Sequence, residues 1–184
     1  CGSWHDGRRM VGDVLGRDGS NHGTTAGGTC RPGVTTCAPA GWQQAANSAF
    51  IMALNSGAET FEGISYTEIY THTDEVVQPN DSAATSSSAL HTGKGKITNV
   101  ATQDVCPTDV FEHLTIGTID PTAYALALDA LNDVGPAKPS RIGTASCSQL
   151  FQPGVDPSNV AMYLSILSAA PGLARVVLPD ASLC

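Results

Sequence analysis

The chain has 184 residues, of which 41% are hydrophobic and 14% charged, and its formal net charge is −8. This length fits one domain with a sizeable core, and the composition excludes a disordered tail. The acidic balance, without any cluster of Lys and Arg, gives no electrostatic support for binding nucleic acid or an anionic membrane surface. No apolar run approaches the roughly 18 residues that a membrane-spanning helix needs.

The first 72 residues predict two strands, a loop and a helix. A short strand is expected around Met10–Leu15, and residues 27–41 are a loop dense in Gly, Pro and Thr. Apolar residues at three- and four-residue spacing over 42–57 predict a helix that stops at Gly57. The β-branched and aromatic run 64–72 predicts a second strand.

The next segments predict a loop, a third strand and a capped helix. Residues 81–95 are polar and are expected to form a surface loop, and residues 96–103 are expected to form a strand. Residues 120–135 predict a helix with Asp120 as its cap and Pro121 in its first turn.

The remaining segments set the fold class. After a linker at 135–140, residues 156–179 predict mostly helix, broken or kinked near residues 171–172, where Pro and Gly follow each other. Strands that alternate with helices argue for an α/β fold with a mainly parallel sheet. No boundary divides the chain, so residues 1–184 are expected to form one domain.

Six cysteines occur without a CxxC pair, which leaves zinc and thioredoxin-type sites weakly supported. Widely spaced cysteines and few lysines favour an oxidising, extracellular setting, so we expect a secreted protein. A bridge between Cys30 and Cys37 would close the short loop between them, and Cys106 and Cys147 could pair across a helix-containing segment. Cys1 and Cys184 pair either with each other or with partners beyond the two ends. The start at Cys1 rather than Met is expected of a processed product or a fragment.

Asp74 and His113 are the candidate catalytic residues. Asp74 follows the strand at 64–72, and His113 lies ten residues past Gln103, where the next strand is expected to end. In open α/β sheets, functional groups gather outside the carboxyl ends of the strands. An acid followed by a histidine at these ends is the order of α/β-hydrolases, in which the acid orients the imidazole and the imidazole takes a proton from a serine.

Two other interpretations compete with this one. An Asp after a strand is more often a turn-former, and a single His is usually structural or exposed. A metal site is also conceivable from the oxygen and nitrogen ligands among these side chains, although their spacing fits no zinc pattern. Asp74 and His72 would share one face of an extended strand. The candidate metal ligands are His22, His72, Asp74, His91 and His113.

Four parts of the sequence carry a family resemblance: WQQAANSAFIMALN, YTHTDEVVQP, NVATQDVCP with EHLTIG, and IGTASC. They resemble the C-terminal half of secreted serine lipases of the α/β-hydrolase fold, most closely the family of fungal lipase B and its bacterial relatives. The resemblance runs from about Val11 to about Leu178. It implies a partial α/β-hydrolase fold with mainly parallel strands and flanking helices.

The resemblance also implies roles for individual residues. Asp74 matches the triad acid and His113 the triad histidine. Gln44, Val76 and Val77 match residues that line the substrate pocket, and 156–177 matches a helix flanking its mouth. Cys106 and Cys147 match one family disulfide. The expected substrate is an ester of a lipid, with transient contact to a lipid interface and no cofactor.

Two features depart from the family pattern. No G-x-S-x-G elbow occurs, although the family's nucleophile sits on such an elbow upstream of the matched segments. A late family disulfide has two cysteines, whereas here Cys184 is the last residue. We therefore expect a fragment of a triacylglycerol lipase or carboxylesterase that carries the Asp and the His but not the serine, truncated at both ends and inactive alone. The alternative is a secreted, non-catalytic domain that binds acyl chains.

Overall fold

The computed structural model describes residues 11–26 and 38–173. Three parallel strands form its sheet in the order β1–β2–β3: β1 (Asp13–Arg17), β2 (Ser65–Tyr70) and β3 (Lys96–Ala101). The three expected strands are therefore confirmed, with their ends shifted by at most three residues. The central strand β2 is buried along almost its whole length, as is typical of a parallel strand covered on both faces.

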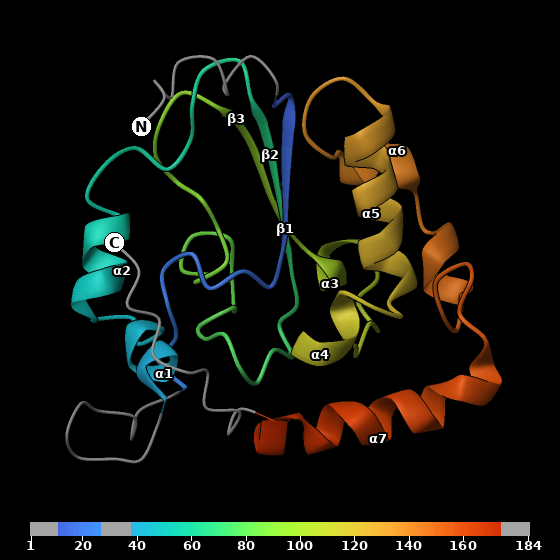
Figure 1. The fold of residues 1–184 in the computed structure, drawn as a ribbon. Coiled ribbons are helices and arrows are strands. Elements are labelled where there is room, and N and C mark those ends of the chain that lie inside the picture. Colours follow the sequence, from blue (N-terminus) through green and yellow to red (C-terminus); the bar gives the residue numbers. More distant parts are fainter. Residues whose placement is uncertain (1–10, 27–37, 174–184) are drawn as a thin grey trace.

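Short helices follow the strands, and two longer helices come late in the chain (Figure 1). The shorter ones are α1 (Pro39–Gln43), α2 (Ala49–Leu54), α3 (Thr102–Val105), α4 (His113–Ile116), α6 (Pro139–Ile142) and the 3-10 helix η2 (Ala145–Ser148), and the longer ones are α5 (Pro121–Asn132) and α7 (Pro157–Leu173).

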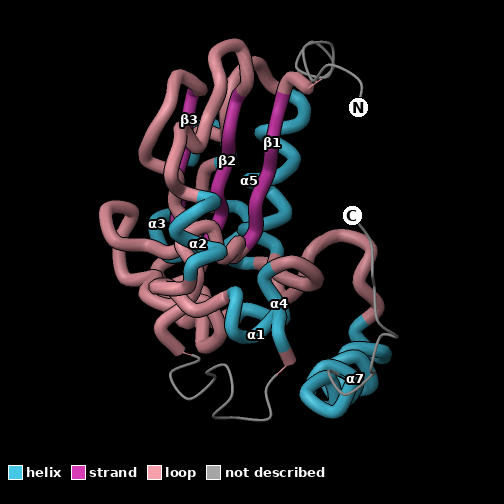
Figure 2. The backbone as a smooth tube through the Cα atoms, turned by 60° about the vertical axis from the view of Figure 1, so that its left-hand side comes forward, coloured by secondary structure: helices cyan, strands magenta, loops and turns pink. Residues whose placement is uncertain are grey.

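Helix α5 covers one face of the sheet, and α2 lies on the other side near the carboxyl ends of the strands (Figures 1 and 2). Ile69 on β2 and Val100 on β3 pack with the inner face of α5, where Ala123 and Leu126 are fully buried. The Asp120 carboxylate caps α5 by accepting hydrogen bonds from the backbone N–H groups of Thr122 (2.7 Å) and Ala123 (3.1 Å). The expected cap is thus confirmed.

The single helix expected over 42–57 is wrong: a turn separates α1 from α2. The backbone of Thr24 pairs with this turn, because its N–H donates to the Gln44 carbonyl (2.7 Å) and its carbonyl accepts from the Ala46 N–H (3.0 Å). Gly23 permits this approach, since a Cβ there would lie 2.7 Å from the Gln44 carbonyl oxygen. Apolar spacing in the sequence could not reveal a pairing with a residue so far away.

Three smaller expectations also need correction. The segment expected as a linker at 135–140 begins α6 at Pro139. The loop 81–95 is not all at the surface, since residues 86–89 are buried. Helix α7 continues to Leu173, the last described residue before the C-terminal end, so the break expected at 171–172 is not seen within the described part.

Candidate active site

Asp74 lies in a tight turn four residues after β2 and is 3% exposed. Its Oδ1 accepts hydrogen bonds from the backbone N–H groups of Val76 and Val77, both at 2.7 Å. Its Oδ2 accepts one from Asn80 Nδ2 at 3.2 Å. Asp74 is therefore a turn-former, as one interpretation of the sequence held, and its second oxygen is directed elsewhere.

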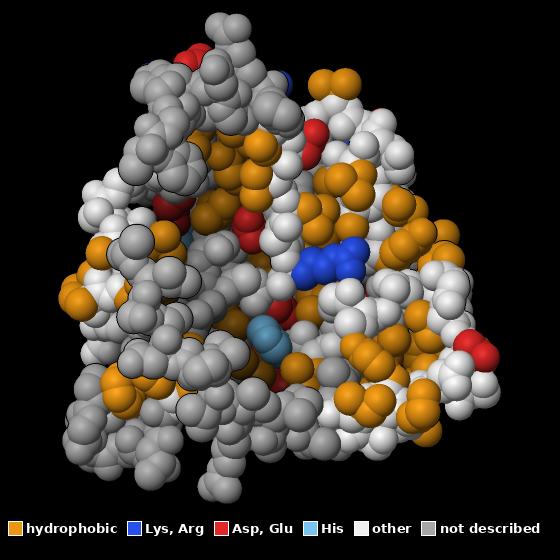
Figure 3. Space-filling view, viewed as in Figure 1, with side chains coloured by type: hydrophobic (Ala, Val, Ile, Leu, Met, Phe, Trp, Pro, Cys, Tyr) orange, Lys and Arg blue, Asp and Glu red, His pale blue; other side chains and the backbone are white. Residues whose placement is uncertain are grey.

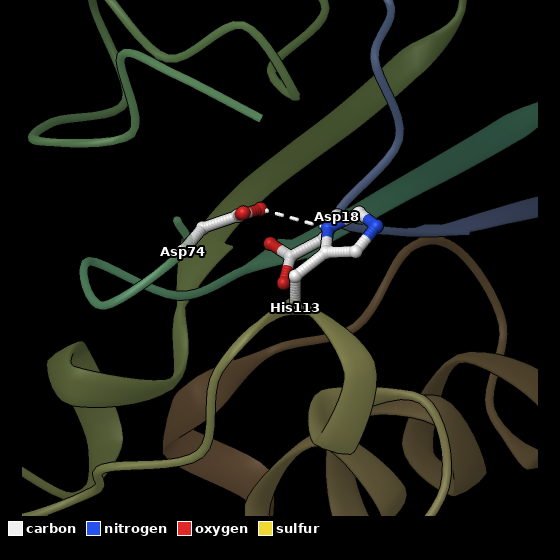
Figure 4. Close-up of side chains that lie close together, drawn as sticks. All are labelled: Asp18, Asp74 and His113. Atoms are coloured by element: carbon white, nitrogen blue, oxygen red, sulfur yellow. Dashed lines mark hydrogen bonds and ion pairs between the residues drawn. The ribbon is translucent and has the colours of Figure 1, made fainter. Parts of the chain in front are cut away.

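His113 is the partner of that second oxygen. It is the first residue of α4, which Glu112 caps by accepting from the Leu114 N–H at 2.9 Å. His113 Nδ1 lies 3.1 Å from Asp74 Oδ2, and the exposed fractions of the two side chains are 25% and 0%. Because the carboxylate can only accept, Nδ1 carries the hydrogen, and the lone pair of the neutral ring is left on Nε2. Figure 4 shows Nε2 on the side of the ring away from Asp74.

The surroundings make the imidazole more basic. Its hydrogen bond to Asp74 raises the pKa of His113 above the ordinary 6.5, while burial acts in the opposite direction. The negative charges of Asp74 and Glu75 add to the rise in the pKa of His113. A histidine with this partner, partial exposure and an Nε2 without a hydrogen-bond partner among the described residues has the geometry that a general base needs.

Asp18 is the third acidic or basic group of the cluster and was missed by sequence reasoning. It directly follows β1 and is 3% exposed. One donor atom each from Asp18, Asp74 and His113 can be chosen so that all three lie within 4.8 Å of one another. Figure 4 shows these side chains converging from the end of β1, the loop after β2 and the start of α4. Burial raises the pKa of Asp18 from 3.8 to about 8, and the charge of Asp74 acts in the same direction.

A signal for Asp18 existed in the sequence. Asp18 follows the first strand as Asp74 follows the second, so the rule that placed Asp74 at the functional edge of a parallel sheet applies to both. Asp18 precedes Gly19, and an Asp-Gly pair after a strand is an ordinary turn signal, which hid it.

The loop that follows Asp74 supports the site with buried polar side chains. Asn80 Nδ2 donates to Ser88 Oγ (3.2 Å) as well as to Asp74, and Ser86 Oγ donates to Asn80 Oδ1 (2.6 Å). Each of these side chains is at most 3% exposed. These polar side chains can be buried because they form hydrogen bonds with one another. The same hydrogen bonds fix the position of the Asp74 carboxylate.

The predicted pocket residues lie together, near the acid. Thr24 joins them, since its N–H donates to the Gln44 carbonyl (2.7 Å) and its hydroxyl to the Val76 carbonyl (2.7 Å). The Gln44 side chain is exposed and accepts a hydrogen bond from the Ser20 hydroxyl. Val76 is 41% exposed, whereas Val77 is 3% exposed.

A cavity of about 300 Å³ lies elsewhere, between the turn that precedes α5 and the first turns of α7. Ile119, Val160 and Tyr163 are among its lining residues. Gln44, Val76 and Val77 do not line this cavity, whereas residues of the segment 156–177, expected to flank the pocket mouth, do. Figure 3 shows hydrophobic side chains gathered over this side of the molecule, and histidine and acidic side chains at the surface below the strand ends.

The other candidate metal ligands have separate partners. His22 Nε2 lies 2.8 Å from Glu59 Oε1, and the His22 ring stacks on His91 with centroids 5.5 Å apart. His72 lies beyond the end of β2, and its Nδ1 is 2.6 Å from the Asn80 carbonyl. The prediction that His72 and Asp74 share one face of a strand is therefore wrong, because β2 ends at Tyr70. Asp18, Asp74 and His113 could offer a metal one atom each, but both Asp74 oxygens already accept N–H donors.

The disulfide between Cys106 and Cys147 is confirmed, and their Cα atoms lie 5.3 Å apart. It ties the end of α3, just before the His113 segment, to η2. The expected bridge between Cys30 and Cys37 lies outside the described residues, as do Cys1 and Cys184.

Comparison with known proteins gives two informative relatives. Lipase B of Pseudozyma antarctica is 32% identical over 143 residues, which are 76% of this chain and 40% of that protein. The crystal structure of Aspergillus fumigatus lipase B matches with a TM-score of 0.71 at 29% identity, over 83% of this chain and 38% of the other. The chain is a relative of fungal lipase B.

The lipase B likeness confirms the α/β fold class and its partial character. The chain spans about two fifths of the length of these lipases. No family model matches it. Within the described ranges, the structure contains no helix that is both long and apolar enough to cross a membrane.

Proposed function

We propose that this chain is part of a secreted triacylglycerol lipase or carboxylesterase, in which Asp74 and His113 are the acid and the histidine of a Ser-His-Asp triad. The observation that carries the proposal is the hydrogen bond between His113 Nδ1 and Asp74 Oδ2 (3.1 Å), which leaves Nε2 available on a partly exposed ring. The likeness to two lipases supports the class of reaction.

The reaction proceeds in two halves. Nε2 of His113 takes the proton of a serine hydroxyl while the serine oxygen attacks the ester carbonyl, and the resulting imidazolium is stabilised by Asp74. The protonated ring then gives its proton to the leaving alcohol, and an acyl-serine remains. In the second half, water gives its proton to His113 and attacks the acyl group. His113 then returns the proton to the serine oxygen as its bond to the acyl carbon breaks, which releases the acid and restores the serine.

The nucleophilic serine is proposed to lie outside this chain, in an upstream segment with the elbow and the oxyanion donors. The absence of G-x-S-x-G from the sequence and the partial coverage of the lipase relatives support this. Residues 1–184 would then be one partial domain. The disulfide supports an extracellular location, where such bonds persist.

The acyl chain is proposed to lie against Gln44, Val76 and Val77. The Thr24 hydrogen bonds bring the Gln44 and Val76 segments together, and Asp74 accepts from the N–H groups of both valines. An acyl group held there would lie beside the Asp74–His113 pair. Transient contact with a lipid interface would deliver such a substrate.

A fluorophosphonate probe, which labels activated serines, tests the proposal in two steps. The 184-residue chain alone should not be labelled, because it lacks the nucleophile. A fusion that places the upstream part of a fungal lipase B before this chain should be labelled and should hydrolyse p-nitrophenyl butyrate. Stoichiometric labelling of the chain alone contradicts the missing-serine proposal. A folded fusion that binds fatty acid but neither labels nor hydrolyses favours the non-catalytic acyl-binding domain.

A further inference from the structure

Asp18 has a buried carboxyl group and an energetically unfavourable backbone conformation. Its φ is +44°, a left-handed value that residues other than glycine adopt rarely. Two hydrogen bonds hold it there: its N–H donates to the Ile69 carbonyl (2.9 Å), and its Oδ1 accepts from the Thr71 N–H (3.0 Å). Both partners belong to β2 or its end, so the conformation is fixed by the sheet.

The second carboxyl oxygen of Asp18 needs a hydrogen-bond partner, because it is buried. Oδ2 is buried and has no hydrogen-bond partner in the part of the chain that the structure describes. The Asp74 carboxylate lies beside the Asp18 carboxyl group, with an oxygen of each within 4.8 Å of the other. Two ionised carboxylates cannot bond each other, and burying both would cost free energy that one imidazolium does not offset. A proton on Asp18 turns this repulsive contact into a hydrogen bond.

We propose that Asp18 is a positioning residue of the Asp74–His113 pair: its neutral carboxyl group donates an O–H to the Asp74 carboxylate. The donor would be Oδ2, because Oδ1 already accepts from Thr71. Asp74 then accepts from His113, Asn80 and the two valine amides as well as from Asp18, and its position is held from every side. The raised pKa of Asp18 agrees with this state.

The charges around the cluster favour one negative charge rather than two. Asp74, from the loop after β2, raises the pKa of Asp18, and His113, from α4, lowers it. Glu75 adds a further negative charge that acts on His113. With Asp18 neutral, the charge of the acid–histidine pair changes near neutral pH only through the titration of His113. Ionisation of Asp18 in alkaline solution would break its bond to Asp74 and disturb the position of the imidazole.

The test uses NMR titration of the full chain, and hydrolysis is not needed. The role in catalysis rests on the proposed function, but the titration does not, so either can fail without the other. In the wild-type chain, the ¹³C carboxyl signal of Asp18 should titrate near or above pH 7. A midpoint for Asp18 below pH 5 overturns the proposal, and this measurement requires no variant.

Two substitutions test the positioning role. Asp18→Asn keeps the shape and a hydrogen donor, so the His113 titration midpoint should move by less than about 0.3 pH unit and its low-field Nδ1–H signal should persist. If Asp18 were ionised, this substitution would remove a charge and lower the midpoint by about 1 unit or more. Asp18→Ala removes the donor and should broaden the Nδ1–H signal by admitting exchange with water.

The remaining outcomes are also decisive. Asp13→Asn changes an exposed acid at the start of β1, is the matched control and should leave both His113 signals unchanged. Identical Nδ1–H signals in Asp18→Asn and Asp18→Ala contradict the proposed hydrogen bond. Stoichiometric binding of Zn²⁺ that is lost in Asp18→Asn would show an ionised metal ligand and would equally overturn the proposal. If Asp18→Ala does not fold, the wild-type and Asp18→Asn titrations decide.

Discussion

Substitution of Asp74 by Asn should change both the basicity and the tautomer of His113. The amide can still accept the N–H groups of Val76 and Val77 with its oxygen, so the turn is expected to survive. Its NH₂ group then faces His113 Nδ1 and can only donate. The neutral ring must therefore accept at Nδ1 and carry its hydrogen on Nε2, which removes the lone pair that a general base needs.

The size of the effect follows from the bond that is lost. A hydrogen bond between charged partners contributes about 1.5–3 kcal/mol, or roughly 1–2 pH units of titration midpoint. Because 25% of the His113 side chain is exposed, solvent screens the interaction, and we expect the lower value, about 1 unit. Burial, which lowers the pKa of His113, would no longer be opposed by the Asp74 charge.

Long-range ¹H–¹⁵N NMR of histidine side chains measures both quantities. Wild-type His113 should titrate above 6.5 and should be the Nδ1–H tautomer when neutral, whereas Asp74→Asn should titrate lower and be the Nε2–H tautomer. Asp81→Asn, an exposed acid in the same loop, is the matched control. An unchanged midpoint and tautomer in Asp74→Asn would refute the assignment of Asp74 as the partner that orients His113.

The same substitution has a pH-dependent effect on stability. A folded-state pKa raised above the unfolded value stabilises the fold below pH 6.5, and this contribution is lost as pH rises through the folded-state pKa of His113. The free energy of unfolding lost in Asp74→Asn should therefore be larger at pH 5 than at pH 8, by about 1.4 kcal/mol for a shift of about one unit. Equal losses at both pH values would contradict the coupling.

Three further predictions concern the surroundings of the site. The double substitution Cys106→Ser with Cys147→Ser opens a loop of sequence separation 41 and should lower the free energy of unfolding by about 4 kcal/mol. Urea denaturation of the oxidised wild type and of the double variant measures this difference, and a loss below about 1 kcal/mol would contradict the prediction. Asn80→Ala removes buried hydrogen bonds to Asp74, Ser86 and Ser88 and should cost about 2–3 kcal/mol, whereas Asn132→Ala, whose one bond is exposed, should cost less than about 1 kcal/mol. Burial raises the pKa of Glu68 from 4.5 to about 7, so its stabilising contribution is present below pH 4.5 and lost as pH rises to about 7. Glu68→Gln should accordingly gain stability over wild type between pH 4.5 and 8, by at most about 3 kcal/mol, and a constant difference in melting temperature would show that Glu68 titrates normally.

The prediction that Asp74 and His113 meet could be made from the sequence because parallel strands end at one edge of the sheet. The periodic patterns located the strands well enough to place both residues at that edge, and the structure confirms their contact. The role of the pair in catalysis stays a proposal. The bridge between Cys106 and Cys147 was one of several pairings open from spacing alone, and the family resemblance selected it.

Two of the wrong predictions, those for 42–57 and 81–95, share a physical cause, which is hydrogen bonding that the local sequence pattern does not show. The turn between α1 and α2 exists because Thr24 bonds to Gln44 and Ala46, although the apolar spacing of 42–57 suits an uninterrupted helix. The polar run at 86–88 is buried because Asn80 satisfies it. Composition assigns a polar run to the surface because it cannot show that the side chains bond one another.

The central claim is that His113 is the general base of an ester hydrolase. Its most direct test is p-nitrophenyl butyrate hydrolysis by the fusion of an upstream fungal lipase B segment to this chain, compared with the His113→Ala form of the same fusion. We expect hydrolysis by the first, and a fall in kcat of about 10³-fold or more in the second, because the serine loses the group that takes its proton. Equal hydrolysis by the two folded fusions would contradict the claim.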